Sequence, residues 1–231
     1  NCPQTRALLA RKGKLRAIVS LPDHAFRKAG AQNKTSILFF QKFTTQEQRA
    51  FDRAMARVTE QLLEPVRARL REQGKDQATA SLEVGEGIDR AMEEAGLGYQ
   101  VFLAEANHVG YAPTGMPSPQ NDLYQRGNNG ALNPDQSRTI IGEWRNFLGA
   151  PDAYAGNAQP DCMALPFSTL WNAHDSHRLD PKYHLFQREA ARPLPPGWVR
   201  ERIGNLMRRR DVPVERFEAD RIYTVLTISQ T

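Results

Sequence analysis

The fold is decided by residues 15–42, which read LRAIVSLPDHAFRKAGAQNKTSILFFQK. Two short apolar runs, Ala17 to Leu21 and Ser36 to Phe40, flank a basic loop that carries one aromatic residue, Phe26. Each run has the length of one strand and mixes β-branched with large apolar residues without polar alternation. This pattern predicts strands buried on both faces in a layered α/β domain. Pro22 is expected to end the first strand, because proline cannot donate a hydrogen bond within a sheet.

The connection between the two runs is longer than the few residues that close most hairpins, and such long loops usually have a function. Its charged residues are Arg27 and Lys28 against Asp23. Two interpretations stay open. Phe26 can plug the edge of the sheet while the cations are merely solvated, or the loop can be the working part of the molecule.

The string from Leu15 to Lys42 closely resembles the end of the catalytic domain in adenine-specific DNA methyltransferases, particularly the modification subunits of type I restriction systems and their fused relatives. The resemblance implies an antiparallel strand pair at the end of a Rossmann-like sheet. It also implies that Phe26 stacks on an adenine swung out of the DNA duplex, where an aromatic face returns roughly 1–3 kcal/mol of lost stacking. Arg27, Lys28 and Lys34 would then lie near the flanking phosphates.

The composition argues against a membrane-spanning, secreted or disulfide-stabilised protein. The chain has 231 residues, 40% hydrophobic and 25% charged, enough for one domain or for a part-domain and the start of another. No apolar stretch approaches the roughly 20 residues of a membrane span, and no secretory leader is expected. Cys2 and Cys162 are far apart, which argues against a disulfide scaffold and favours a cytoplasmic location. The net charge of +5 is compatible with a polyanionic partner.

Helices are predicted on both sides of the strand pair. Arg6 to Arg11 resembles the last turns of a helix that begins upstream of the chain. After the second strand, Thr44 and Glu47 form a capping box. A helical stripe then continues to about Glu72, with Pro65 expected to kink or split it. The stripe consists of Phe51, Met55, Val58, Leu62, Val66 and Leu70.

Three further patterns suggest ligand sites, and each has a plainer interpretation. Gly85-Glu86-Gly87 before a helix suggests a phosphate loop, but without a third glycine or a clear preceding strand a plain turn is favoured. His108 is a candidate general base, although no partner can be identified by spacing and a structural hydrogen bond is favoured. A histidine and aspartate cluster suggests a metal, yet it matches no known ligand spacing; it comprises His174, Asp175, His177, Asp180 and His184.

The middle of the chain contains a predicted strand, Gln100 to Ala104. The pattern ANHVGYAPTG followed by NDL, residues 106–123, resembles the same methyltransferase family just after its core sheet. Asn133 or Asp135 is expected to open a short amphipathic helix. Residues 149–166 are rich in alanine, proline, glycine and asparagine, which is typical of a domain boundary. The apolar side of the helix comprises Ile140, Ile141, Trp144, Phe147 and Leu148.

From Leu179 the segments LDPKYH, LPPGWVRERIGNLMRRRD and YTVLTISQT resemble the opening of a target-recognition domain in type I specificity subunits. Arg208, Arg209 and Arg210 form a cationic run suited to phosphates or to a guanine edge. A solvated basic patch is the alternative. The chain stops within a strand-like run, so the recognition domain is expected to be truncated.

These observations predict an α/β chain in three parts. Residues 1–148 would be the C-terminal part of a methyltransferase catalytic domain with a helical insertion, 149–178 a linker, and 179–231 the beginning of an α+β target-recognition domain. The family's glycine-rich loop for S-adenosylmethionine and its catalytic Asn-Pro-Pro-aromatic motif are not in this sequence. The chain alone is therefore expected neither to bind the methyl donor nor to transfer the methyl group.

The resemblance implies part of a site-specific adenine N-6 methyltransferase of a restriction-modification system. Its expected partners are double-stranded DNA and either restriction and specificity subunits or further copies of the chain. The alternative is a non-catalytic DNA-binding specificity or assembly module that retains a methyltransferase tail.

Overall fold

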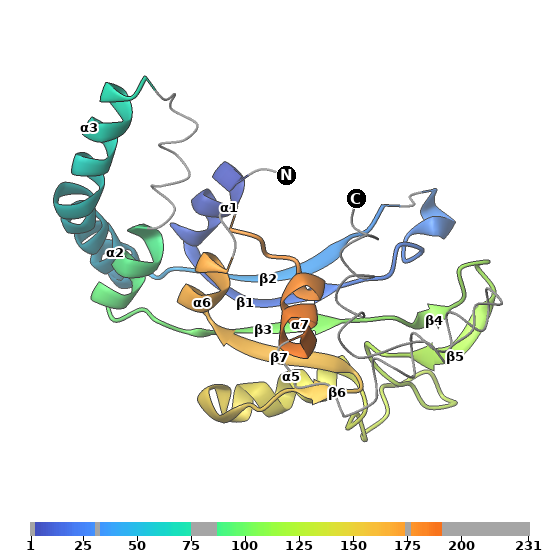
Figure 1. Cartoon of the computed structure of the whole chain (residues 1–231). Coiled ribbons are helices and arrows are strands. Elements are labelled where there is room, and N and C mark those ends of the chain that lie inside the picture. The colour runs from blue at the N-terminus through green and yellow to red at the C-terminus, as the bar shows by residue number, and fades with distance from the viewer. Residues whose placement is uncertain (1–2, 31–32, 75–86, 174–176, 191–231) are drawn as a thin grey trace, which may run out of the picture. The chain divides into compact units, whose positions relative to one another are not determined.

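The computed structural model describes residues 3–30, 33–74, 87–173 and 177–190 (Figure 1). The chain divides into two compact units, Asn1–Gln187 and Arg188–Thr231. The description below concerns the first unit. No helix in the described part of the chain has the length and the apolar content that crossing a membrane requires.

A five-stranded mixed sheet forms the centre of the first unit, with the strand order β2-β1-β3-β7-β6. β1 pairs antiparallel with β2 and parallel with β3, and β7 pairs antiparallel with both β3 and β6. The predicted mixed α/β class and the predicted antiparallel pairing of the first two strands are therefore confirmed. The strands are β1 (Gly13–Ser20), β2 (Ser36–Lys42), β3 (Gln100–Glu105), β6 (Asn157–Ala158) and β7 (Asp161–Pro166).

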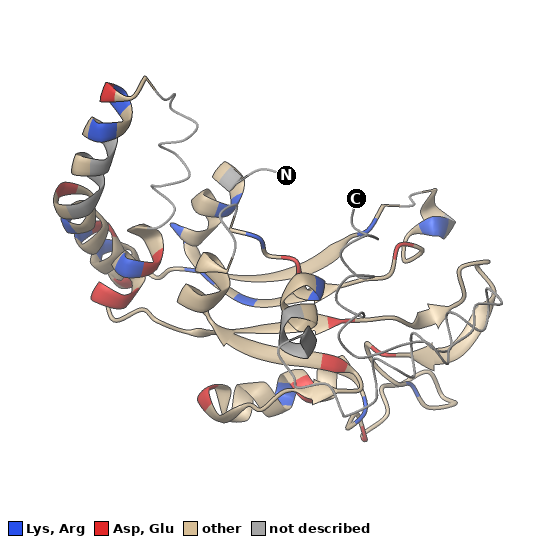
Figure 2. Ribbon diagram, viewed as in Figure 1, with Lys and Arg blue, Asp and Glu red and all other residues tan. Residues whose placement is uncertain are grey.

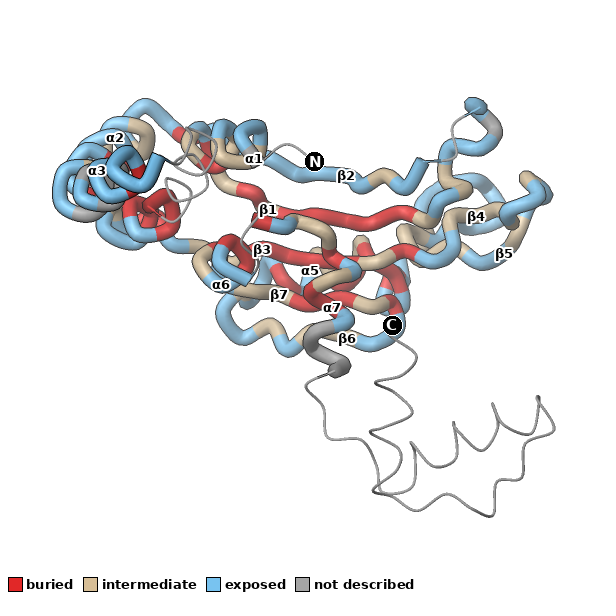
Figure 3. Tube along the Cα trace, turned by 45° about the horizontal axis from the view of Figure 1, so that its top comes forward, coloured by how far each residue is buried: buried red, intermediate tan, exposed pale blue. Residues whose placement is uncertain are grey.

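Two hydrophobic cores lie on opposite faces of the sheet. Successive residues of β3 alternate between them, because side chains of a strand point to opposite faces: Leu103 belongs to the first core and Phe102 to the second. The first core is built with helices α1 (Pro3–Ala10), α2 (Thr45–Val58), 87–94, α6 (Phe167–Asn172) and α7 (Pro181–Ala190), and the second with α5 (Ile140–Gly149). Figure 3 shows β1 and β3 buried along most of their length.

The burial predicted for the second strand was wrong. Every residue of β2 is exposed, whereas β1 is mostly buried (Figure 3). The reason is the position of β2, which is the edge strand of the described sheet. Within that sheet its only neighbouring strand is β1.

The long helix after β2 begins as predicted and is interrupted near the proline. Thr44 accepts a hydrogen bond from the Glu47 backbone N–H, while the Glu47 carboxylate accepts one from the Thr44 backbone N–H, so the capping box is confirmed. After α2 a π-helical turn, Thr59–Leu63, leads into α3 (Glu64–Glu72). Pro65 has no N–H to donate to the carbonyl four residues earlier, which accounts for the irregular turn just before it.

Two predicted boundaries were wrong. α5 begins at Ile140 with Thr139 as its N-cap, so neither Asn133 nor Asp135 opens the helix. Residues 149–178 are not a linker, because they contain β6, β7 and α6, and β7 pairs with β3 over its whole length.

The expected start of the second domain also differs from the structure. Leu185, which the prediction assigned to the recognition domain, is 2% exposed in the first core, and Leu179 packs against that core. The first unit therefore continues past residue 178.

Candidate nucleic-acid interface

The loop that carries Phe26 and a separate hairpin lie at the same edge of the sheet, where β1 and β3 end. β1 and β3 are parallel, with Ser20 opposite Glu105, so their carboxyl ends meet at this edge. The loop leaves from β1, and from β3 the chain turns into the antiparallel hairpin of β4 (Val109–Tyr111) and β5 (Pro117–Asn121) (Figure 1). Open α/β sheets bind ligands outside the carboxyl ends of parallel strands, so this edge is the natural candidate site.

Phe26 lies in the loop with its side chain exposed. The residue is 46% exposed, and it immediately precedes a single 3-10 turn, Arg27–Ala29. Gly30 ends the turn in the left-handed conformation, with φ of 83°, which glycine adopts without steric cost. Ala25, rather than Phe26, packs against the second core. The ring is therefore not sealed inside the protein, which disfavours the interpretation that it plugs the sheet.

The β4–β5 hairpin holds the Phe26 loop in place. Arg27 Nη1 donates a hydrogen bond of 2.6 Å to the Pro113 backbone oxygen, and the Tyr111 hydroxyl donates one to the Ala25 backbone oxygen. The His24 ring also meets the Tyr111 ring edge to face, with centroids 6.0 Å apart. These contacts hold the backbone before Phe26 and the side chain of the residue after it, and they leave the Phe26 ring exposed.

The predicted DNA-contacting cations have different environments. Arg27 is exposed but bonded to the hairpin, and Lys34 is exposed with Nζ 3.7 Å from an Asp180 carboxylate oxygen. Lys28 belongs to the 3-10 turn, and its side chain lies outside what the structure describes. Figure 2 shows basic residues, in blue, on the connection between β1 and β2. Arg208, Arg209 and Arg210 lie outside the described residues.

His108 takes part in a structural network at the same edge. Both oxygens of Asp122 lie 3.3 Å from His108 Nδ1, and Asp122 Oδ2 accepts hydrogen bonds of 2.8 Å from the backbone N–H groups of Asn107 and His108. The carboxylate thus fixes the turn between β3 and β4, which agrees with the structural role favoured for His108.

Two histidines of the cluster that suggested a metal, His177 and His184, make structural contacts. His177 is buried, stacks on Trp171 with centroids 4.2 Å apart, and bonds the Trp171 backbone oxygen through Nδ1 at 2.9 Å. His184 Nε2 lies 2.8 Å from the Arg178 backbone oxygen, and burial lowers its pKa. No group of three metal-ligating side chains occurs in the described ranges. His174, Asp175, Gly85 and Glu86 lie outside them.

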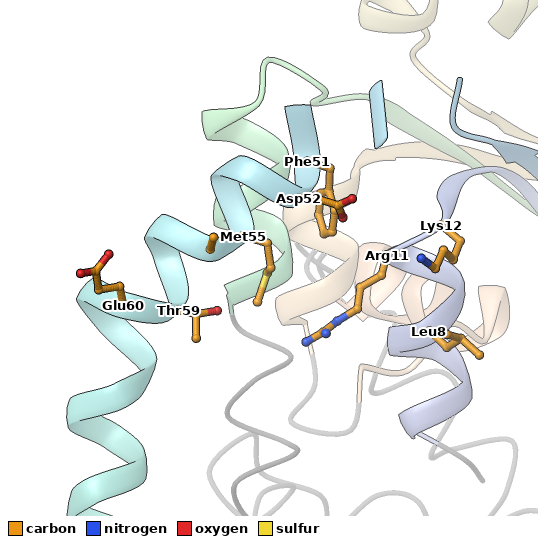
Figure 4. Close-up of a pocket in the computed structure, with 9 residues that line it drawn as sticks. Leu8, Arg11, Lys12, Phe51, Asp52, Met55, Thr59 and Glu60 are labelled. Atoms are coloured by element: carbon orange, nitrogen blue, oxygen red, sulfur yellow. The ribbon is translucent and has the colours of Figure 1, made fainter. Parts of the chain in front are cut away.

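A cavity of about 660 Å³ lies elsewhere, between α1 and α2 (Figure 4). Leu8 and Met55 provide apolar walls, and charges of both signs surround them, including Arg11 and Glu60. None of the predicted site residues lines this cavity, and its mixed charges do not select a ligand.

Sequence reasoning missed two residues of the interface, Tyr111 and Asp122. Both fall in the quoted segment 106–123, but the Tyr111 contact joins residues 86 positions apart. No spacing rule predicts such a contact. The only sequence signal was the resemblance of the segment itself.

No known protein family matches the sequence, and no curated protein or solved structure shows significant similarity to it. Function is therefore inferred from the geometry of this edge and from the quoted motifs.

Proposed function

We propose that this chain provides the base-stacking ring and part of the DNA contact surface of a site-specific adenine N-6 DNA methyltransferase, acting in the cytoplasm as part of a restriction-modification system. The observation that carries the proposal is Phe26. Its side chain is 46% exposed on a loop that the β4–β5 hairpin contacts, beside the carboxyl ends of β1 and β3, so the ring is available to a ligand.

The chemistry of a flipped base explains this arrangement. A base extruded from the duplex loses its stacking neighbours, and a fixed aromatic face restores roughly 1–3 kcal/mol of stacking. Because the hairpin already holds the loop, binding does not lose the free energy that ordering a mobile loop would cost. Lys34 and Arg27 stand on the same loop, where their positive charge favours the phosphates beside the extruded nucleotide.

The residues of this chain do not fit the methyl donor. S-adenosylmethionine would supply the methyl group, but the sequence has neither a glycine-rich donor loop nor an Asn-Pro-Pro-aromatic motif. We assign both functions to protein segments outside this sequence. The part performed by the chain is to stack on the base and contact the backbone.

A fluorescence experiment with the full chain tests the proposal. The probe is a DNA duplex with a mispaired 2-aminopurine, whose extrusion costs little energy. We expect Phe26→Ala to weaken binding to this duplex about tenfold, within the roughly 1–3 kcal/mol that one stacked base contributes. Phe26→Trp should retain the affinity, and Leu132→Ala, at another exposed apolar position, should have no effect.

The result also separates the proposal from the alternative of a non-catalytic DNA-binding module. Equal affinity for matched and mispaired duplexes, together with no effect of Phe26→Ala, would remove Phe26 from the site and favour that module.

A further inference from the structure

The turn of the β4–β5 hairpin carries an exposed apolar side chain next to the Phe26 loop. Met116 is 66% exposed, more than Phe26 itself, and it directly precedes β5. The hydrogen bond from Arg27 to the Pro113 backbone oxygen joins the loop to this same turn. The loop and the turn therefore present two exposed apolar side chains from one edge of the sheet.

The turn holds Met116 in a defined position. The Gly115 backbone N–H donates a hydrogen bond of 2.8 Å to the Ala112 oxygen, and the Ala112 N–H donates one of 2.8 Å to the Met116 oxygen. Gly115 has φ of 85°, a conformation that glycine adopts without steric cost. Residues 113–119 also include three prolines, each of which restricts the backbone. Binding at the turn would thus order little that is not already ordered.

The charge of this edge favours a polyanion. Residues 23–34 carry three cations and one carboxylate, and residues 106–121 contain no Asp, Glu, Lys or Arg. In Figure 2, β4 and β5 carry no charged residue. Two carboxylates near the edge have partners: Asp122 accepts from backbone N–H groups, and Glu105 lies 3.4 Å from Lys182 Nζ. An uncharged turn beside a basic loop can approach DNA phosphates without repulsion.

Extruding a nucleotide exposes two apolar surfaces in the DNA. One is the base itself, which the proposed function assigns to Phe26. The other is the gap in the stack, bordered by the flat faces of the neighbouring base pairs. Proteins that distort DNA insert apolar side chains, including methionine, between such base pairs. The unbranched methionine side chain suits an irregular space of this kind.

We infer that Met116 enters the gap that the extruded nucleotide leaves in the duplex, while Phe26 stacks on the extruded base. The inference rests on the proposed function, because the gap exists only when a base is extruded. The antiparallel pair of β4 and β5 is a two-stranded ribbon, which the major groove of DNA is wide enough to admit. Figure 1 shows this hairpin beyond the end of β3, where the sheet does not obstruct it.

Affinities of the full chain for three DNA probes of one sequence test this inference. The first is the duplex with a mispaired 2-aminopurine, the second has an abasic site at the same position, and the third is the single strand that contains the 2-aminopurine. The abasic duplex retains the gap but offers Phe26 no base, and the single strand offers a base but no gap. We expect Met116→Ala to weaken binding to both duplexes about tenfold, since apolar contact area is lost, and to leave binding to the single strand unchanged.

Two control variants accompany Met116→Ala. Met116→Leu should retain most of the affinity for both duplexes, because a side chain of similar volume still fills the gap. Leu8→Ala should have no effect on any probe: Leu8 is 58% exposed on α1, which leads into the opposite end of β1. Since Met116 is exposed, Met116→Ala should also leave the melting temperature unchanged.

Two results would overturn the inference. If Met116→Ala binds the abasic duplex as tightly as the wild type does, the side chain fills no gap. If the substitution weakens binding to the single strand as much as to the duplexes, Met116 contacts DNA outside the gap.

The same probes separate this inference from the role of Phe26. If Phe26→Ala leaves binding to the mispaired duplex unchanged while Met116→Ala weakens binding to the abasic duplex, the role of Met116 stands and the stacking role of Phe26 fails. If Phe26→Ala weakens binding to the mispaired duplex while Met116→Ala binds all three probes like the wild type, the proposed function stands and the role of Met116 fails.

Discussion

The clamp between the Phe26 loop and the β4–β5 hairpin leads to a prediction for Tyr111→Phe. The substitution removes the hydroxyl that donates to the Ala25 backbone oxygen and keeps the ring that meets His24. A single intramolecular hydrogen bond contributes about 0.5–1.5 kcal/mol. The hydrogen bond from Arg27 to the Pro113 oxygen remains. The loop should therefore separate from the hairpin more often than in the wild type, while still spending most of the time in contact with it. We therefore expect affinity for the 2-aminopurine duplex to fall about fivefold, which corresponds to about 1 kcal/mol.

Hydrogen exchange of residues 24–30 measures the same effect without DNA. In the wild-type chain, backbone N–H groups on both sides of Phe26 donate within the loop, and a weaker clamp should make them exchange faster. Tyr124→Phe is the matched control, because the Tyr124 ring lies under Arg126, on a different loop. Unchanged exchange and unchanged affinity in Tyr111→Phe would refute the idea that the hairpin organises the ring.

Three further predictions concern the framework that carries the site. Thr44→Ala should lower the free energy of unfolding by about 1 kcal/mol in urea titrations, since it removes the N-cap of α2. Hydrogen bonds from the Thr44 backbone and from Lys14 lower the pKa of Glu47 from 4.5 to about 2. The stability that the ionised carboxylate contributes is complete above pH 4.5 and is lost as the pH falls toward 2, and Glu47→Gln should remove this dependence in melting curves. Gly142→Ala should destabilise the fold by about 3 kcal/mol, because its Cβ would lie 1.9 Å from the Gln136 backbone oxygen; a melting temperature within about 2 °C of wild type would contradict this.

Local features of the fold were predictable because their causes are local. The capping box depends on two residues three positions apart, and both hydrogen bonds form as predicted. The strand from Gln100 to Ala104 was predicted within one residue of β3, since an apolar run bounded by polar residues has few alternatives.

The features that failed depend on distant neighbours. The sequence of β2 indicates a buried strand, but burial requires elements on both faces and a second neighbour at its edge. Glycine, proline and asparagine precede β7 and give its region the composition of a boundary, yet the pairing of β7 with β3 makes it part of the sheet. The N-terminus of α5 was misplaced because Asn133 and Asp135 cap local turns instead, each accepting a hydrogen bond from the backbone two residues later.

In the candidate site, Phe26 could be predicted from the sequence, but its contact with the β4–β5 hairpin could not. Phe26 was selected through the resemblance of residues 15–42, since the long basic loop with a single aromatic left both interpretations of the loop open. That its ring is exposed and its backbone clamped depends on the parallel arrangement of β1 and β3, which brings a hairpin from 86 positions away to the same edge. Without the clamp, the loop would have to be ordered by the ligand, and each immobilised side chain would reduce affinity by roughly 0.5–1.5 kcal/mol. A pre-ordered loop thus presents an exposed ring to a base without that loss of affinity.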